Sequence, residues 1–350
     1  MWYPLPEFLA RPANRRRVTL AHRIALFLVD EKNEFQRLLR ADAEETAASH
    51  RLTVDTRFSG MDFAAQLSSI RDCLDGSERP SAMLVMCVSD RGLQKVAQRA
   101  AHAGVHVLFL NASEDDLGAV RAENPAVALG IVCPDEHETG RIQGRQFRQL
   151  VPPRGKVLYV QGRIRSKAAR DRTAGVFEVL EGSPIEVMPL EAGWTAEDGR
   201  EAVGTWLRMA LRANRHLDLI GCQNDMIAEG ALEALNVIAT EFGRPDVRRI
   251  PVTGCDGSPA FGQPMVRRGE LRATVVLPRS TGPAVEAIAR TLRGGELPPP
   301  CLLLKPTSYP SETELRPEPR FDGQPGSGAG TSLTNGVPAP LQPAGPARRA

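Results

Sequence analysis

Residues 219–235 read LIGCQNDMIAEGALEAL, a short apolar run that passes directly into a segment with helical spacing of apolar residues. This pattern indicates a buried strand that ends where a helix begins. Three polar residues, Gln223, Asn224 and Asp225, stand at the junction. An Asp at a helix start accepts hydrogen bonds from the first free backbone N–H groups, so we predict that Asp225 caps this helix. The two amides need another explanation.

The same pattern recurs along most of the chain, where short β-rich apolar runs alternate with helical segments. This alternation predicts parallel sheets built from right-handed βαβ units, and ten strands suit two sheets better than one. The predicted strands are residues 23–29, 52–58, 82–88, 105–110, 127–133, 156–161, 185–190, 217–221, 248–254 and 273–278.

Two changes of composition predict domain limits. A polar stretch between Asn111 and Val127 interrupts the rhythm, which then restarts, so we place a domain boundary near residues 132–134. Beyond Tyr309 the chain is rich in Pro, Gly and Ser and poor in large apolar residues. We expect residues 311–350 to form a disordered tail.

Composition narrows the class of protein. The 350 residues are 42% hydrophobic, enough for a sizeable core. A net charge of +2 gives no electrostatic case for direct nucleic-acid binding.

The six scattered cysteines form no C-x-x-C pair, so we expect reduced thiols and no metal site. No cofactor is expected. The first thirty residues lack the order of a secretory signal, which predicts a cytoplasmic protein as written, or a periplasmic or cell-envelope protein if the start is incomplete.

Polar side chains gather after the predicted strands, where ligands bind in open α/β sheets. They are mostly amides, carboxylates and arginines with single aromatic residues. Such groups suit a sugar, because hydroxyls both donate and accept hydrogen bonds and the C–H face of the ring packs on an aromatic side chain.

Motifs for serine hydrolases, zinc proteases and P-loop enzymes are absent from the sequence. His137 is expected to be structural.

Five segments resemble the type I periplasmic sugar-binding proteins, of which the ribose binders match best. The resemblance covers about residues 23–306 and implies two Rossmann-like α/β domains joined by a three-segment hinge. It implies an N-terminal lead at 1–22, a first lobe of 23–133 plus 277–300, and a second lobe of 134–276 plus 301–310. The segments, in chain order, are IALFLVDEKNEF (24–35), SKAARDRTAGVFEVL (166–180), LIGCQNDMIAEGALEAL (219–235), VTGCDGSP (252–259) and ATVVLPRSTGPAVEAI (273–288).

The resemblance also implies ligand-binding residues. Asn111 and Ala112 replace an Asp-Arg pair of the ribose binders, Gln36 replaces a second stacking aromatic, and an apolar residue near Val276 replaces a glutamine. Losing these hydroxyl partners predicts a ligand other than ribose. Asp225 remains the predicted cap, Gln223 keeps no assigned role, and the predicted site consists of Asn33, Phe35, Asn111, Arg172, Trp194, Asn224 and Asp256.

The resulting functional prediction is a non-enzymatic protein that binds a small sugar or sugar-like ligand in the cleft between two domains and closes on a hinge. The resemblance implies a substrate-binding component of an ABC-type sugar importer, with a transporter permease or a signalling receptor or kinase as its protein partner. The alternative is an intracellular ligand sensor that passes its open or closed state to a regulatory partner.

Overall fold

The computed structural model describes residues 22–89, 92–110 and 117–317. These residues form two α/β lobes, each with its own sheet. The elements of the first lobe are β1 (Arg23–Leu28), α1 (Glu34–Ser49), β2 (Thr53–Phe58), α2 (Phe63–Asp75), β3 (Ala82–Met86), α3 (Leu93–His102), β4 (His106–Leu110), α4 (Gly118–Glu123), β5 (Leu129–Pro134), α10 (Thr281–Leu292) and β11 (Cys301–Leu304). Those of the second are α5 (Glu136–Leu150), β6 (Lys156–Gln161), α6 (Lys167–Leu180), β7 (Glu186–Glu191), α7 (Ala196–Arg212), β8 (Leu219–Cys222), α8 (Asp225–Glu241), η1 (Pro245–Arg249), β9 (Val252–Thr253), α9 (Gly262–Arg267), β10 (Thr274–Val276), β12 (Thr307–Tyr309) and η2 (Glu312–Glu314).

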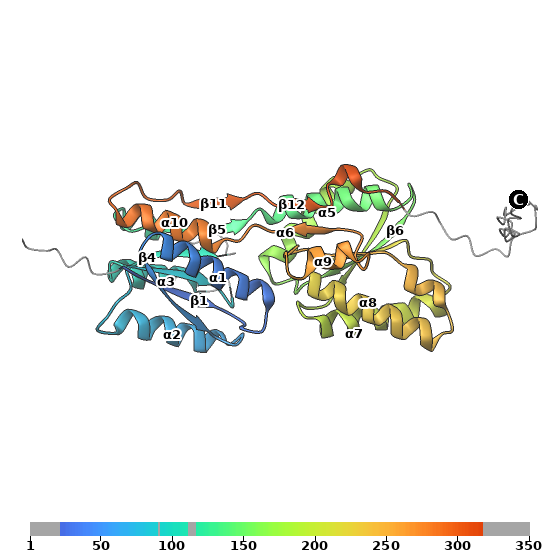
Figure 1. The fold of residues 1–350 in the computed structure, drawn as a ribbon, viewed down its shortest axis with the longest axis horizontal. Coiled ribbons are helices and arrows are strands. Elements are labelled where there is room, and N and C mark those ends of the chain that lie inside the picture. The colour runs from blue at the N-terminus through green and yellow to red at the C-terminus, as the bar shows by residue number, and fades with distance from the viewer. Residues whose placement is uncertain (1–21, 90–91, 111–116, 318–350) are drawn as a thin grey trace, which may run out of the picture. The chain divides into compact units, whose positions relative to one another are not determined.

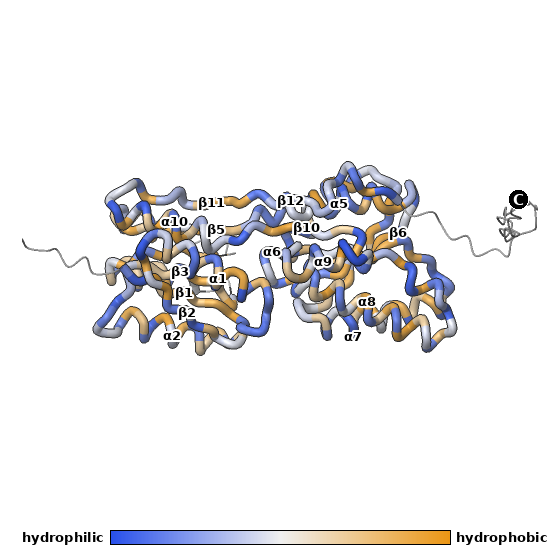
Figure 2. Tube along the Cα trace, viewed as in Figure 1, coloured by the Kyte–Doolittle hydropathy of each residue, from blue (hydrophilic) through white to orange (hydrophobic). Residues whose placement is uncertain are grey.

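The first lobe is built on a parallel sheet with strand order β11-β5-β4-β3-β1-β2. Helices α2, α3 and α4 pack on one face, and α1 and α10 on the other. Figure 1 shows α2 on the opposite side of the sheet from α1 and α10. Because both faces are covered, the central strands are almost entirely apolar, as the colouring of β1 and β3 shows (Figure 2).

The second lobe repeats this plan with the parallel order β7-β6-β8-β9. Helices α5 and α6 pack on one face, and α7 and α8 on the other. Beside β9 lies the antiparallel pair β10-β12, joined to the β9 segment by bridges at Thr253–Ala273 and Asp256–Val276.

The chain crosses between the lobes three times, after β5, between β10 and α10, and between β11 and β12. This arrangement confirms the predicted fold class of two α/β lobes with parallel sheets. Each of the ten predicted strands corresponds to an observed one, whereas β11 and β12 were not predicted.

Two predicted limits were wrong. Residues 301–304 were assigned to the second lobe, but β11 pairs with β5 at the edge of the first sheet. The disordered tail was predicted from residue 311, but Leu315 is buried in the second lobe and Glu312 pairs with Arg145 of α5 at 2.8 Å. Residues 318–350 and the lead before residue 22 lie outside the described residues, and the other domain limits stay predictions.

Helices α5 and α6 lie in direct backbone contact. A Cβ at Gly140 would be 2.0 Å from the Arg172 carbonyl oxygen, and one at Gly175 would be 2.2 Å from the His137 carbonyl oxygen. Only glycine permits such an approach. The contact places Arg172 beside the first turn of α5, where Glu136 lies.

All six cysteines are within the described residues, and none forms a disulfide.

Across residues 22–317, apart from the two undescribed gaps, no helix combines the length and the apolar character that crossing a membrane requires.

Candidate ligand-binding site

The start of α1 contributes one wall of the site. Asn33 caps the helix, since its Oδ1 accepts a hydrogen bond from the Gln36 N–H at 3.2 Å. Gln36 is buried and its Oε1 accepts from the N–H groups of Val29 at 2.7 Å and Asp30 at 3.1 Å. Gln36 therefore completes the end of β1, while Asn33 and Phe35 remain partly exposed.

At the β8–α8 junction the helix cap is Asn224. Its Oδ1 accepts from the Ile227 N–H at 2.7 Å, and its Nδ2 donates to the Trp194 carbonyl at 3.0 Å. The prediction that Asp225 is the cap was therefore wrong by one residue. Asn224 is 4% exposed, and its ligand-binding role stays a prediction.

Asp225 instead turns into the lobe. Its carboxylate accepts from the Gly257 N–H at 2.8 Å and from the Thr274 hydroxyl at 2.7 Å, which explains why it does not cap α8. Burial raises the pKa of Asp225 well above the usual range, and the neighbouring charge of Asp256 raises it further. Asp225 thus links β8, the loop after β9 and β10.

Gln223, which the sequence left without a role, is structural. Its Oε1 accepts from the Gly162 N–H at 2.9 Å, and its Nε2 donates to the Tyr159 hydroxyl at 3.1 Å and the Ala169 carbonyl at 3.0 Å. The Gln223 carbonyl in turn accepts from Arg172. These bonds fix α6 against the ends of β6 and β8.

Arg172 is the centre of a buried cluster in the second lobe. It is 4% exposed, its Nε lies 2.6 Å from Glu136 Oε2, and its guanidinium carbon lies 5.8 Å from the centre of the Trp194 ring. The ring rests on Gly162, where a Cβ would be 2.2 Å from the ring. The structure therefore gathers three predicted site residues, Arg172, Trp194 and Asn224, in one place.

A narrow crevice between the lobes brings together three more predicted residues, Asn33, Phe35 and Asp256. Ser258 Oγ donates across it to Glu34 Oε1 at 2.9 Å. The crevice has a volume of about 10 Å³, close to the minimum for one water molecule, so a sugar can enter only if the lobes separate. Its lining residues are Asn33, Glu34, Phe35, Asp225, Met226, Asp256, Ser258 and Phe261.

Asp256 has unusual backbone and side-chain surroundings. Its φ of 102° lies in a region that residues other than glycine rarely adopt, a type of strain common at ligand sites. Its backbone is fixed by bonds to Val275 and Leu277. Among the described residues its carboxylate has no hydrogen-bond partner. Burial raises the pKa of Asp256 to about 7; Arg172 opposes this shift and nearby carboxylates add to it.

The remaining predictions concern Asn111 and His137. Asn111 lies outside the described residues. His137 is partly exposed on α5, and its Nε2 lies 2.6 Å from Glu178 Oε2, which agrees with a structural role. Sequence reasoning missed Glu34, Glu136 and Ser258. Glu136 follows the cap of α5, Asp135, and its position two residues after β5 was an available signal.

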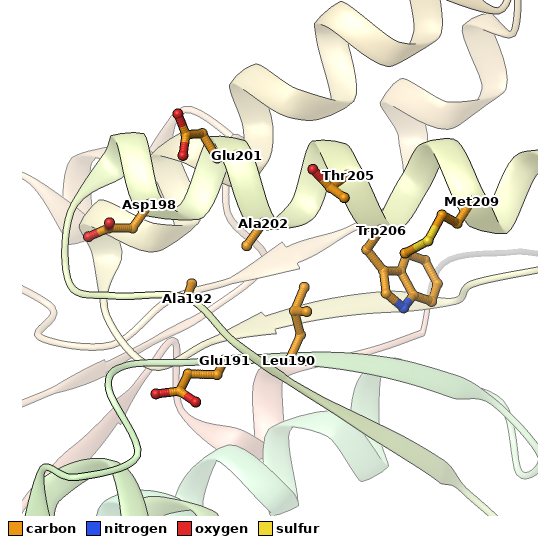
Figure 3. A pocket seen from close by; sticks show the side chains of 9 residues that line it. All are labelled: Leu190, Glu191, Ala192, Asp198, Glu201, Ala202, Thr205, Trp206 and Met209. Atoms are coloured by element: carbon orange, nitrogen blue, oxygen red, sulfur yellow. The ribbon is translucent and has the colours of Figure 1, made fainter.

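A larger hollow of about 380 Å³ lies between β7 and α7 (Figure 3). Trp206 and Met209 lie at one end and Asp198 at the other. The hollow contains none of the predicted site residues.

In the described part of the chain, no group of three or more His, Cys, Asp or Glu residues is arranged to hold a metal ion.

The sequence matches the periplasmic binding protein domain model over residues 24–284. The chain belongs to the type I periplasmic sugar-binding protein family. The galactofuranose-binding protein YtfQ of Escherichia coli is 25% identical, over 71% of this chain and 75% of that protein. The D-ribose/D-allose-binding protein of Pseudomonas aeruginosa is 23% identical, over 72% and 76%. A relative from Rhizobium meliloti is 25% identical, and the match spans only about half of its length.

Solved structures share the fold of these periplasmic binding proteins. An ABC transporter solute-binding protein from Actinobacillus succinogenes with bound D-allose gives a TM-score of 0.70 at 20% identity, covering 84% of this chain and 98% of that one. One from Bacillus halodurans with bound myo-inositol gives 0.68 at 18% identity, covering 82% and 93%. At these identities the comparison establishes the fold alone.

Proposed function

We propose that the protein binds a small sugar or sugar-like ligand between its lobes without chemical conversion, as the substrate-binding component of an ABC-type importer. The observation that carries the proposal is the crevice itself. It places the Asn33 and Phe35 segment of the first lobe against an Asp256 carboxylate that has no partner among the described residues. The names of the family relatives support the ligand class.

The proposed binding mode follows from the chemistry of these groups. Sugar hydroxyls donate to Asp256, the Asn33 amide can both donate and accept, and Phe35 offers a flat apolar face. Because the ligand contacts both lobes only when they are close together, it binds the closed state better and shifts the population toward it. No covalent step is needed in this account.

A thermal-shift screen with D-ribose, D-allose, D-galactose and myo-inositol tests the proposal. A true ligand at about 100 times its dissociation constant adds roughly 2.7 kcal/mol of stability and raises the melting temperature. Calorimetry then compares Asp256→Asn, expected to weaken the selected sugar at least about tenfold because it replaces a charged acceptor. The matched control Asp246→Asn removes an exposed carboxylate paired with Arg244 and should leave binding unchanged. Equal affinities for the two variants would refute the site.

A second candidate is a sensor whose closure is passed to a signalling partner. The observation that favours it is a solved structure of the same fold, with a TM-score of 0.67, which is the fructose-binding periplasmic domain of a hybrid two-component system. Co-purification from the native host distinguishes the candidates: a permease partner supports the importer, and a kinase or regulator supports the sensor.

A further inference from the structure

The candidate site contains more carboxylates than cations. Arg172 is the cation whose charge acts on Asp256, and the carboxylates of Glu34 and Glu136 act on the same group. Lys167 lies near Glu136 but already pairs with Asp171 on its own helix. Within the described residues, these carboxylates therefore exceed the cations that face them.

Glu136 supplies an independent observation that points to a ligand. The side chain is 8% exposed, and only one of its oxygens, Oε2, is paired, with Arg172 at 2.6 Å. Its second oxygen, Oε1, is buried and has no hydrogen-bond partner. An unsatisfied buried carboxylate oxygen is costly, so such atoms call for a missing donor.

Glu136 belongs to the candidate site through its partner Arg172, whose guanidinium carbon lies 5.8 Å from the centre of the Trp194 ring. Glu136 is the first residue of α5, directly after the crossing from β5, and its charge acts on both Cys255 and Asp256 in the loop after β9. Asp256 lines the crevice and lacks a partner among the described residues. Two acceptors on different elements of the candidate site thus have unused hydrogen-bonding capacity.

We propose that the ligand carries a protonated amine, as an amino sugar or amino cyclitol does, and that Glu136 and Asp256 receive its ammonium group. This inference rests on the proposed function and specifies its ligand class. A ligand with hydroxyls alone could donate to both carboxylates but would bring no cation to pair with an ionised Asp256, which is unfavourable in a buried site. An ammonium group supplies three donors and the missing charge.

Matched ligand pairs test the inference on the wild-type chain. Calorimetry near neutral pH compares D-glucosamine with D-glucose and D-galactosamine with D-galactose, and the N-acetyl forms serve as uncharged controls of similar shape. We expect at least one amino sugar to bind at least about tenfold more tightly than both its hydroxyl and its N-acetyl counterparts. Tighter or equal binding of the neutral sugars overturns the inference and leaves the proposed function standing. Failure of every compound to bind overturns both.

A variant pair assigns the preference to Glu136. Glu136→Gln keeps an oxygen that can accept from Arg172 and removes the charge, so the amine-to-hydroxyl affinity ratio should fall at least about tenfold. The matched control Glu138→Gln removes a charge from the same helix, where Glu138 pairs with Arg145 at 2.8 Å, and should keep the wild-type ratio. An unchanged ratio in Glu136→Gln, with a melting temperature close to wild type, contradicts the assignment.

Discussion

At the scale of single residues, Asp225 is a buried carboxylate that the Gly257 N–H and the Thr274 hydroxyl stabilise in its charged form. Because burial raises the pKa of Asp225, its carboxyl group binds a proton more tightly in the folded state than in the unfolded chain. Asp225 therefore contributes most to stability at low pH, where its carboxyl group is protonated. This contribution is lost as the pH rises from about 4 toward the raised pKa.

Replacing Thr274 with valine should destabilise the protein by about 1–3 kcal/mol, since it removes a donor to a buried carboxylate. The loss should be larger at pH 8 than at pH 5, because Thr274 stabilises the charged form. Urea unfolding at the two pH values measures it. Thr253→Val is the matched control: Thr253 is also fully buried, but its hydroxyl has no hydrogen-bond partner, so this variant should cost little at either pH. Equal losses in both variants would contradict the role given to Asp225.

Amino-sugar binding should also depend on pH through Asp256, whose pKa is raised to about 7 by burial. An ammonium group binds the ionised carboxylate, so affinity should rise as the pH increases toward 7 and fall below it. Calorimetry in buffers of different ionisation enthalpy should detect release of a proton on binding near pH 6. Affinity for D-glucosamine or D-galactosamine that is independent of pH between 5 and 7 would argue against Asp256 as the partner.

The crevice residues that could be predicted from the sequence are those that follow strands within the quoted segments, such as Asn33 and Asp256. It could not separate the roles of Asn224 and Asp225, since both residues cap helices well and only the donors from the distant Gly257 and Thr274 decide between them. Glu136 was missed because its importance depends on an arginine 36 residues away in the chain.

At the scale of elements, the contact of α5 with α6 positions Arg172 against Glu136. Gly140→Ala should destabilise the protein by about 1–3 kcal/mol, because its Cβ would overlap the Arg172 carbonyl and push the helices apart. Thermal or urea unfolding measures the loss. Gly204→Ala on α7 is the matched control, since its Cβ would lie at ordinary contact distances of 3.7 Å or more. It should be neutral or stabilising by up to about 1 kcal/mol, and a comparable loss there would remove the argument from backbone contact.

Elements were predictable where apolar runs alternate with helical spacing, and ten strands were found in this way. β11 and β12 were not, because a run of prolines precedes Cys301 and Lys305-Pro306 separates the two strands. Both are short, and both are stabilised by partners far away in sequence, β5 and β10. Tertiary pairing, which local patterns do not report, defines them.

At the scale of the whole molecule, we propose that a sugar-like ligand holds the two lobes together. Three crossing segments connect the lobes, and the crevice between them holds polar groups from both sides. The ligand can stabilise the closed state only to the extent that it binds that state better.

Closure of the lobes is measured by small-angle X-ray scattering of the full chain, with and without the compound selected by the sugar and amino-sugar screens. We expect a saturating amount of the compound to lower the radius of gyration, and Asp256→Asn to need at least about ten times more compound for the same change. A radius of gyration that stays constant while calorimetry shows saturation would contradict closure of the lobes around the ligand.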